Sequence, residues 1–108
     1  MTREPLPQRR RCETISYRVG NLPYQASIGY YPDGRPGEIF LDCSKSGTEV
    51  QIAARDSAIV ASFALQHGVT IEAIHSALTR KPDGSAEGPL GVLLDMLTSC
   101  SYTKGDAA

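Results

Sequence analysis

The sequence has 108 residues, 41% of them hydrophobic and 21% charged, with a formal net charge of −1 and three well-separated cysteines. One domain fits this length, and the composition excludes a disordered chain, a membrane helix of roughly 20 apolar residues, and a disulfide framework or zinc knuckle. The near-neutral charge gives no global attraction to nucleic acid or acidic membranes, and the few cysteines favour a reducing, cytoplasmic location.

Residues 1–11 are expected to form a basic N-terminal arm, because they hold two prolines and the run Arg9, Arg10 and Arg11. Between residues 12 and 43, apolar and polar side chains alternate in three stretches, a pattern typical of strands with one buried face. Gly20-Asn21 and Pro32-Asp33-Gly34 separate these stretches and favour turns. Short connections between consecutive strands predict an antiparallel three-stranded meander.

The pattern becomes helical after residue 44. Two overlapping capping boxes, Ser46–Glu49 and Thr48–Gln51, predict a long helix from about Thr48 to Gly68, where glycine accepts the left-handed conformation. A shorter helix is expected from Ile71 to about Arg80.

A last helix is expected to open at Pro89, since proline is tolerated at the first helical position. The predicted fold class is therefore α+β, with a three-stranded antiparallel meander followed by a long buried helix and two shorter helices. The meander and helices form a single domain over residues 12–98, and residues 99–108 are expected to be a flexible tail.

The long helix carries more apolar surface than one short chain can cover. On a helical wheel, residues 49–66 place their polar side chains in one narrow arc made of Gln51, Arg55, Ser62 and Gln66. Most other positions are apolar, so the helix should be buried on most sides. The excess apolar surface predicts that a second copy covers it, which makes the protein a homo-oligomer.

Asp56 is the exception on the apolar side of that helix. A carboxylate there is costly to bury unless it is paired or hydrogen-bonded. Two interpretations remain open: an acid that contacts a ligand or interface, or a structural ion pair with one of the arm arginines Arg9, Arg10 and Arg11.

The candidate ligand-binding residues are Arg9, Arg10, Arg11, Lys45, Ser46, Gly47, Thr48, Arg55, Asp56, Gly88 and Gly91. Guanidinium groups match phosphate oxygens in a bidentate manner, and the two helix starts offer free backbone N–H groups to an anion. Each feature also has a structural explanation: a solvated arm, simple helix capping, or close helix packing at the glycines.

Catalytic and metal sites are not expected. His67 and His75 have no third histidine, cysteine or carboxylate at ligand spacing, and His67 is expected to cap a helix end. No nucleophile has an evident base beside it. The chain is therefore interpreted as a non-catalytic protein without metal or cofactor.

The stretch from Arg9 to Leu97 resembles the TSCPD module of adenosylcobalamin-dependent ribonucleotide reductases, which also occurs as stand-alone proteins, including ones encoded by prophages. The likeness lies in Gln8–Arg11, Tyr31–Leu41, Lys45–Gly47, Ala54–Ser57 with Ala64–Val69, and Gly88–Gly91. The resemblance implies an accessory domain, because the radical-generating cysteines and the cobalamin site belong to a larger barrel that this chain lacks.

One departure from the family concerns the motif that names it, Thr-Ser-Cys-Pro-Asp at the start of the last helix. The equivalent place here is Ala86–Leu90, which keeps the proline but has no cysteine, while Thr98-Ser99-Cys100 stands at the helix end. A thiol or metal role of that motif is therefore not expected in this chain.

Three functions compete at this stage. The first is an oligomeric binder of small nucleotide-like anions, which could sequester a nucleotide signal such as the cyclic nucleotides of bacterial immunity. The second is an interaction module that docks on a ribonucleotide reductase or another host protein through the apolar excess of the long helix. The third is nucleic-acid binding through the arginine arm, which the near-neutral charge disfavours.

Overall fold

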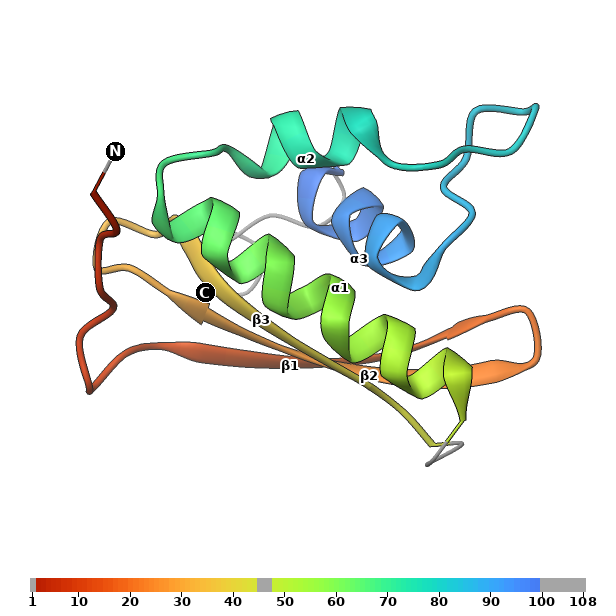
Figure 1. Ribbon diagram of the computed structural model, residues 1–108, viewed down its shortest axis with the longest axis horizontal. Helices are drawn as coiled ribbons and strands as arrows, with labels where there is room; N and C mark the ends of the chain where they lie inside the picture. The colour runs from red at the N-terminus through yellow and green to blue at the C-terminus, as the bar shows by residue number, and fades with distance from the viewer. Residues whose placement is uncertain (1, 45–47, 100–108) are drawn as a thin grey trace.

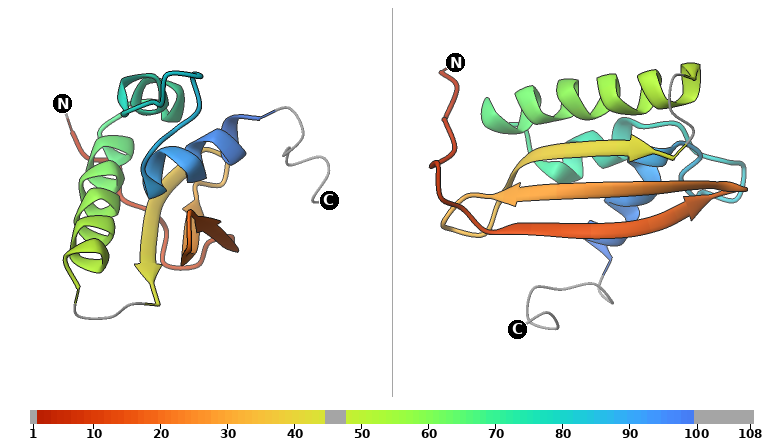
Figure 2. Two further views of the ribbon diagram at one scale, coloured as in Figure 1. Left: turned by 90° about the vertical axis from the view of Figure 1, so that its right-hand side faces the viewer. Right: turned by 90° about the horizontal axis from the view of Figure 1, so that it is seen from below.

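The computed structural model describes residues 2–44 and 48–99, and it confirms the predicted α+β class. Three antiparallel strands form a sheet in the order β1 (Cys12–Val19), β2 (Leu22–Tyr30) and β3 (Pro36–Cys43). Three helices follow: α1 (Glu49–Gln66), α2 (Ile71–Ala77) and α3 (Pro89–Thr98). They lie on one side of the sheet, with α1 alongside β3 (Figures 1 and 2). None of the helices in the described part is long and apolar enough to cross a membrane.

The predicted alternation places one face of the sheet in the core. The register pairs Tyr17 with Tyr24, and Ile28 with Ile39, so that their side chains share the face beneath the helices. Ile28 and Ile39 are fully buried together with Leu93 and Leu94 of α3. Each such side chain contributes about 1.5–3 kcal/mol through burial. The core therefore forms between the sheet, the inner side of α1 and α3.

Local capping residues set the helix starts as the sequence predicts. The Thr48 hydroxyl accepts a hydrogen bond from the Gln51 amide at 3.2 Å, and the Thr70 hydroxyl caps α2 in the same way. The other predicted capping box, Ser46–Glu49, includes residues 46 and 47, which lie outside the described residues. Gly68 follows α1 with φ +95°, as expected for a left-handed helix stop.

The predicted end of α2, the first of the two shorter helices, is wrong. α2 ends at Ala77 and not near Arg80. Arg80 forms an isolated antiparallel bridge with Ala86, and the segment between them folds back through a turn. Leu78, the C-cap of α2, is already extended with φ −80° and ψ 158°, and this ends the helical hydrogen-bond pattern before the bridge.

Less of the surface of α1 is buried than its apolar composition predicts. Ala54, Ala58, Ala61 and Leu65 pack into the core, while several large apolar residues on the opposite side remain exposed within the single chain. Part of the polar arc is turned toward β3, because Gln66 is buried and its side chain donates to the Gly37 carbonyl of β3 at 2.9 Å. Within the arc, the side chain of Arg55 is exposed.

Side chains of the polar arc of α1 form hydrogen bonds with backbone groups at the open edge of the sheet. β3 is an edge strand, and its outward backbone groups need hydrogen-bond partners. The Ser62 hydroxyl accepts from the Ile39 amide at 2.8 Å and lies 3.1 Å from the Ile39 carbonyl. Gln51 donates to the Asp42 carboxylate at 2.9 Å. Helix α1 therefore covers this edge with side chains instead of a fourth strand.

Candidate functional site

The N-terminal arm is a strap across one end of the fold (red in Figure 1). The Glu4 amide donates to the Gln66 carbonyl at 2.7 Å, and the Tyr31 hydroxyl donates to the Glu4 carbonyl at 2.5 Å. Arg3 donates to the Gln66 side chain and also lies over the Phe63 ring, 5.3 Å from its centroid. These contacts tie the arm to the C-terminal end of α1.

Arg10 anchors the arm to the outer face of the sheet. Its Nε donates to the Glu38 carboxylate at 2.7 Å, and the Glu38 side chain is only 11% exposed. The hydrogen bond to Glu38 raises the pKa of Arg10. Glu38 lies across Gly29, where an added Cβ would come within 2.4 Å of its Oε2. The glycine on β2 thus makes room for the carboxylate that holds the arm.

Arg11 packs on an aromatic ring beside this ion pair. Its guanidinium carbon lies 4.2 Å from the centroid of the Tyr30 ring, a cation–π distance. The Tyr30 hydroxyl donates to Glu13 at 2.6 Å, which fixes the ring. A hollow of about 260 Å³, called the arm pocket below, lies here and is lined by Pro7, Arg9, Arg10, Arg11, Tyr30, Tyr31, Pro32 and Gly34.

The arm pocket carries positive charge that the fold does not neutralise. Glu38 compensates Arg10, and Glu4 and Asp33 compensate the neighbouring Arg35. Within residues 2–44 and 48–99, neither Arg9 nor Arg11 makes an ion pair. Two guanidinium groups beside aromatic rings form a setting that suits a phosphate or another anion.

Asp56 does not pair with the arm arginines, so that interpretation is wrong. Arg10 is engaged by Glu38, and Arg11 lies on Tyr30. Asp56 is exposed on the outer side of α1, where water solvates its carboxylate in the single chain.

The other predicted site residues lie apart from the arm pocket. Lys45, Ser46 and Gly47 are outside the described residues. Thr48 follows β3, whose last residues lie at the end of the sheet opposite to the arm. Its hydroxyl caps α1, in agreement with the simple capping interpretation.

The two glycines at the start of α3 differ in their surroundings. Gly91 is buried, and an added Cβ would lie 3.0 Å from the Cβ of Ala86, so close packing accounts for it. Gly88 is the N-cap of α3 and has open space where a Cβ would stand. Among the predicted residues that the structure describes, the single chain therefore forms no single site.

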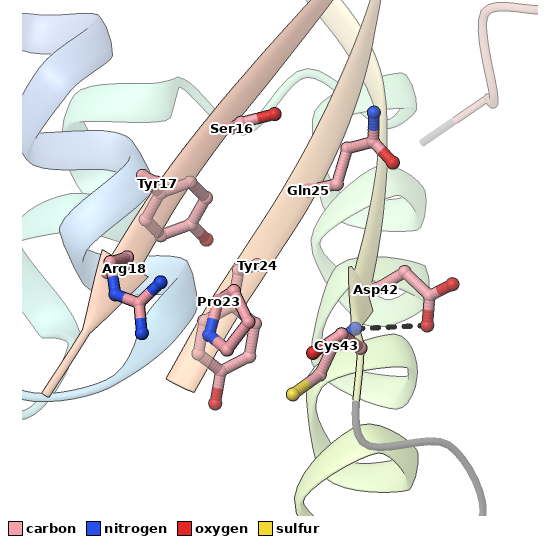
Figure 3. Close-up of a pocket in the computed structure, with 9 residues that line it drawn as sticks. Ser16, Tyr17, Arg18, Pro23, Tyr24, Gln25, Asp42 and Cys43 are labelled. Atoms are coloured by element: carbon pink, nitrogen blue, oxygen red, sulfur yellow. Dashed lines mark hydrogen bonds between the residues drawn. The ribbon is translucent and has the colours of Figure 1, made fainter. Parts of the chain in front are cut away.

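A larger hollow of about 440 Å³, which the sequence interpretation missed, lies at the β1–β2 turn (Figure 3). Tyr17 and Tyr24 stack there with ring centroids 5.8 Å apart. Burial raises the pKa of both phenols, and the Tyr17 hydroxyl donates to the Pro89 carbonyl at 2.7 Å. The Gln51 hydrogen bond lowers the pKa of Asp42. These shifts favour the neutral form of both phenols and the ionised form of Asp42.

His75 and Asp95 form an ion-pair contact between α2 and α3 that the sequence did not reveal. The His75 hydrogen bond lowers the pKa of Asp95, and the Ala86 amide adds to this effect. His67 caps the end of α1 as expected, with its ring Nδ1 2.8 Å from the Phe63 carbonyl. In the described part of the chain, no cluster of three potential metal ligands is present.

Comparison with known proteins gives a family. The model of the TSCPD domain matches residues 3–103. The chain is 36% identical over 89 residues to a vitamin B12-dependent ribonucleotide reductase of Bradyrhizobium diazoefficiens, and 37% identical over 89 residues to that of Agrobacterium fabrum. It is 35% identical over 72 residues to the enzyme of Rhodopirellula baltica.

The matched region covers 80% of this chain in the first two comparisons and 67% in the third, but only 7% of each enzyme. No solved structure matches the chain. The extent of the family match and the identity to these relatives show that the chain belongs to the TSCPD domain family.

Proposed function

We propose that this chain is a non-catalytic accessory module that binds a small nucleotide-like anion in the arm pocket. The observation that carries the proposal is the pair Arg9 and Arg11, which make no ion pair within the described residues and stand beside Tyr30 in a hollow of about 260 Å³. Guanidinium forks bind phosphate oxygens in a bidentate manner. Arg10 serves the site indirectly, because its bond to Glu38 positions the arm.

The size of the arm pocket limits the ligand. Its volume lies slightly below the roughly 300 Å³ at which small-molecule pockets begin, so one phosphate with part of its sugar or base fills it. Larger ligands, such as cyclic dinucleotides, would leave a part outside the pocket of a single chain. Binding without conversion would sequester the ligand.

Family membership supports the nucleotide class. The matched relatives are ribonucleotide reductases, and the chain corresponds to 7% of their length, which fits an accessory part better than the reacting domain. The described residues bring together no nucleophile and base in the arm pocket, so binding is the activity that its chemistry supports.

The test is calorimetric titration of the purified chain with nucleoside mono-, di- and triphosphates, cyclic nucleotides and inorganic phosphate. Arg9→Ala with Arg11→Ala is expected to weaken binding about tenfold or more, since hydrogen bonds to charged groups are the strong ones. Arg18→Ala is the matched control, because Arg18 is exposed at the other end of the sheet.

Two results would contradict the proposal: no nucleotide binds the wild-type chain, or Arg18→Ala weakens binding as much as the arm substitutions. A short single-stranded oligonucleotide completes the series. Binding of the oligonucleotide alone, with an affinity that falls steeply as salt is raised, would favour the nucleic-acid function instead.

A further inference from the structure

A continuous apolar surface lies on the outer side of α1 and β3, away from the arm pocket. It consists of residues that are each 52–68% exposed, and it is called the apolar patch below: Phe40, Ile52, Ile59, Val60 and Phe63. Figure 2 shows α1 at the margin of the molecule, with no other helix over this side. Together these side chains expose roughly 500 Å², which is near the upper range for the largest patch of a monomer.

The patch includes a hollow that could receive a side chain. A depression of about 120 Å³ lies between α1 and β3, and Phe40, Ile59 and Phe63 are among the residues that line it. Val60 lies on the other flank of α1. On a wheel of 100° per residue, it is 120–160° away from Ser62 and Gln66, which face β3. The surface therefore has an apolar ridge on one flank and an apolar depression on the other.

Two charged residues of α1 lie on this surface. Arg55 lies at the β3 margin of the patch, at the wheel position between Ser62 and Gln66, and it helps to lower the pKa of Asp42 on that strand. Asp56 lies about 100° further round, between Phe63 and Val60. Arg55 and Asp56 make no ion pair within the described parts of the chain. Because they carry opposite charges, they can attract each other across an interface between two copies.

We infer that the apolar patch is an interface between two copies of this chain, related by a twofold axis parallel to α1. Such an axis brings each flank against the opposite flank of the second copy. The Val60 ridge of one copy then enters the depression between α1 and β3 of the other. Arg55 of each copy meets Asp56 of the second copy at the same level of the helix, which gives two reciprocal ion pairs.

The area agrees with this occupant. A stable interface buries about 800 Å² per partner, and the roughly 500 Å² of exposed apolar surface supplies its centre while Arg55 supplies part of a polar rim. Ala53 is exposed beside this surface and would allow close helix approach. No residue of the patch lines the arm pocket, so this inference and the proposed function can fail independently.

The test measures molar mass by light scattering during size-exclusion chromatography, at about 100 µM, well above the micromolar dissociation constants of weak interfaces. The wild-type chain is expected at twice its 11.6 kDa mass, and Val60→Glu at the single mass. The control is Val50→Glu, the same change on the same helix, because Val50 is exposed but lies outside the patch. It is expected to remain dimeric. Circular dichroism checks that each variant is folded.

The ion pairs give a second test. Arg55→Asp places two acids against each other and is expected to weaken the dimer at least tenfold, while the double variant Arg55→Asp with Asp56→Arg is expected to restore it. A monomeric wild type, or a Val60→Glu variant that stays dimeric, overturns the inference and leaves the patch to a different protein. Dissociation by Val60→Glu without any effect of Arg55→Asp overturns the parallel arrangement, since an antiparallel axis would set like flanks against each other.

Discussion

The hydroxyl of Ser62 is expected to stabilise the fold through the edge of the sheet. It accepts from the Ile39 amide at 2.8 Å, and Ile39 is 2% exposed. Ser62→Ala leaves this N–H, on a residue that is almost fully buried, without its partner, which costs about 1–3 kcal/mol. Alanine returns about 0.5 kcal/mol through its higher helix propensity. The expected net loss is therefore about 0.5–2.5 kcal/mol of the free energy of unfolding.

Urea denaturation followed by circular dichroism measures this loss at a fixed protein concentration. With a denaturant slope of about 1–3 kcal/mol per molar urea, the midpoint should fall by about 0.2–2.5 M. Ser57→Ala is the matched control, because Ser57 is on the same helix and its hydroxyl bonds only to the Ala54 carbonyl of that helix. Ser62→Thr keeps a hydroxyl and should recover part of the stability. Equal midpoints for Ser62→Ala and Ser57→Ala would refute the role of α1 as the cover of the β3 edge.

Three further substitutions test other contacts. Gly29→Ala would drive a Cβ into a buried carboxylate at 2.4 Å and should lower the stability by about 1–3 kcal/mol, so an unchanged melting temperature would count against the arm anchor. Gly68→Ala forces a side chain into φ +95° and should cost about 1–2 kcal/mol in urea denaturation, whereas Gly88→Ala, which has open space and a negative φ, should be nearly neutral. The His75 contact holds the pKa of Asp95 below its ordinary value, so ionised Asp95 stabilises the fold above its unfolded pKa of about 4, and this contribution is lost as the pH falls through the folded pKa. Asp95→Asn should therefore lower the melting temperature at about pH 6, and the difference should shrink as the pH falls through the folded pKa of Asp95; a pH-independent difference would contradict this explanation.

Much of the fold could be predicted because its determinants act over a few residues. The alternation along the strands, the cap at Thr48 and the glycine at position 68 each fix backbone geometry within about one turn. The end of α2 could not be predicted in the same way, because it depends on the bridge from Arg80 to Ala86 across a turn.

The candidate site was predictable only in part. The arginines of the arm stand out in the sequence, but Glu38, which positions Arg10, is 28 residues away and meets it only after the sheet has formed. The wheel identified the polar arc of α1 correctly, yet it could not show that Gln66 turns toward the backbone of β3. The wheel places Asp56 among apolar residues, but it could not show which side of α1 faces the sheet, so it left a pair with the arm arginines open.

The covering of β3 by α1 also limits how the sheet can grow. The outer edge of β1 has no strand beside it among the described residues, whereas the β3 edge is occupied by serine and glutamine side chains. A second copy of the chain can therefore add to the sheet only at the β1 edge. If it pairs through its own β1 edge, the combined sheet ends in a covered β3 edge on both sides. Fibre formation by strand addition therefore requires α1 to detach first, so that variants that loosen α1 should be the ones that aggregate.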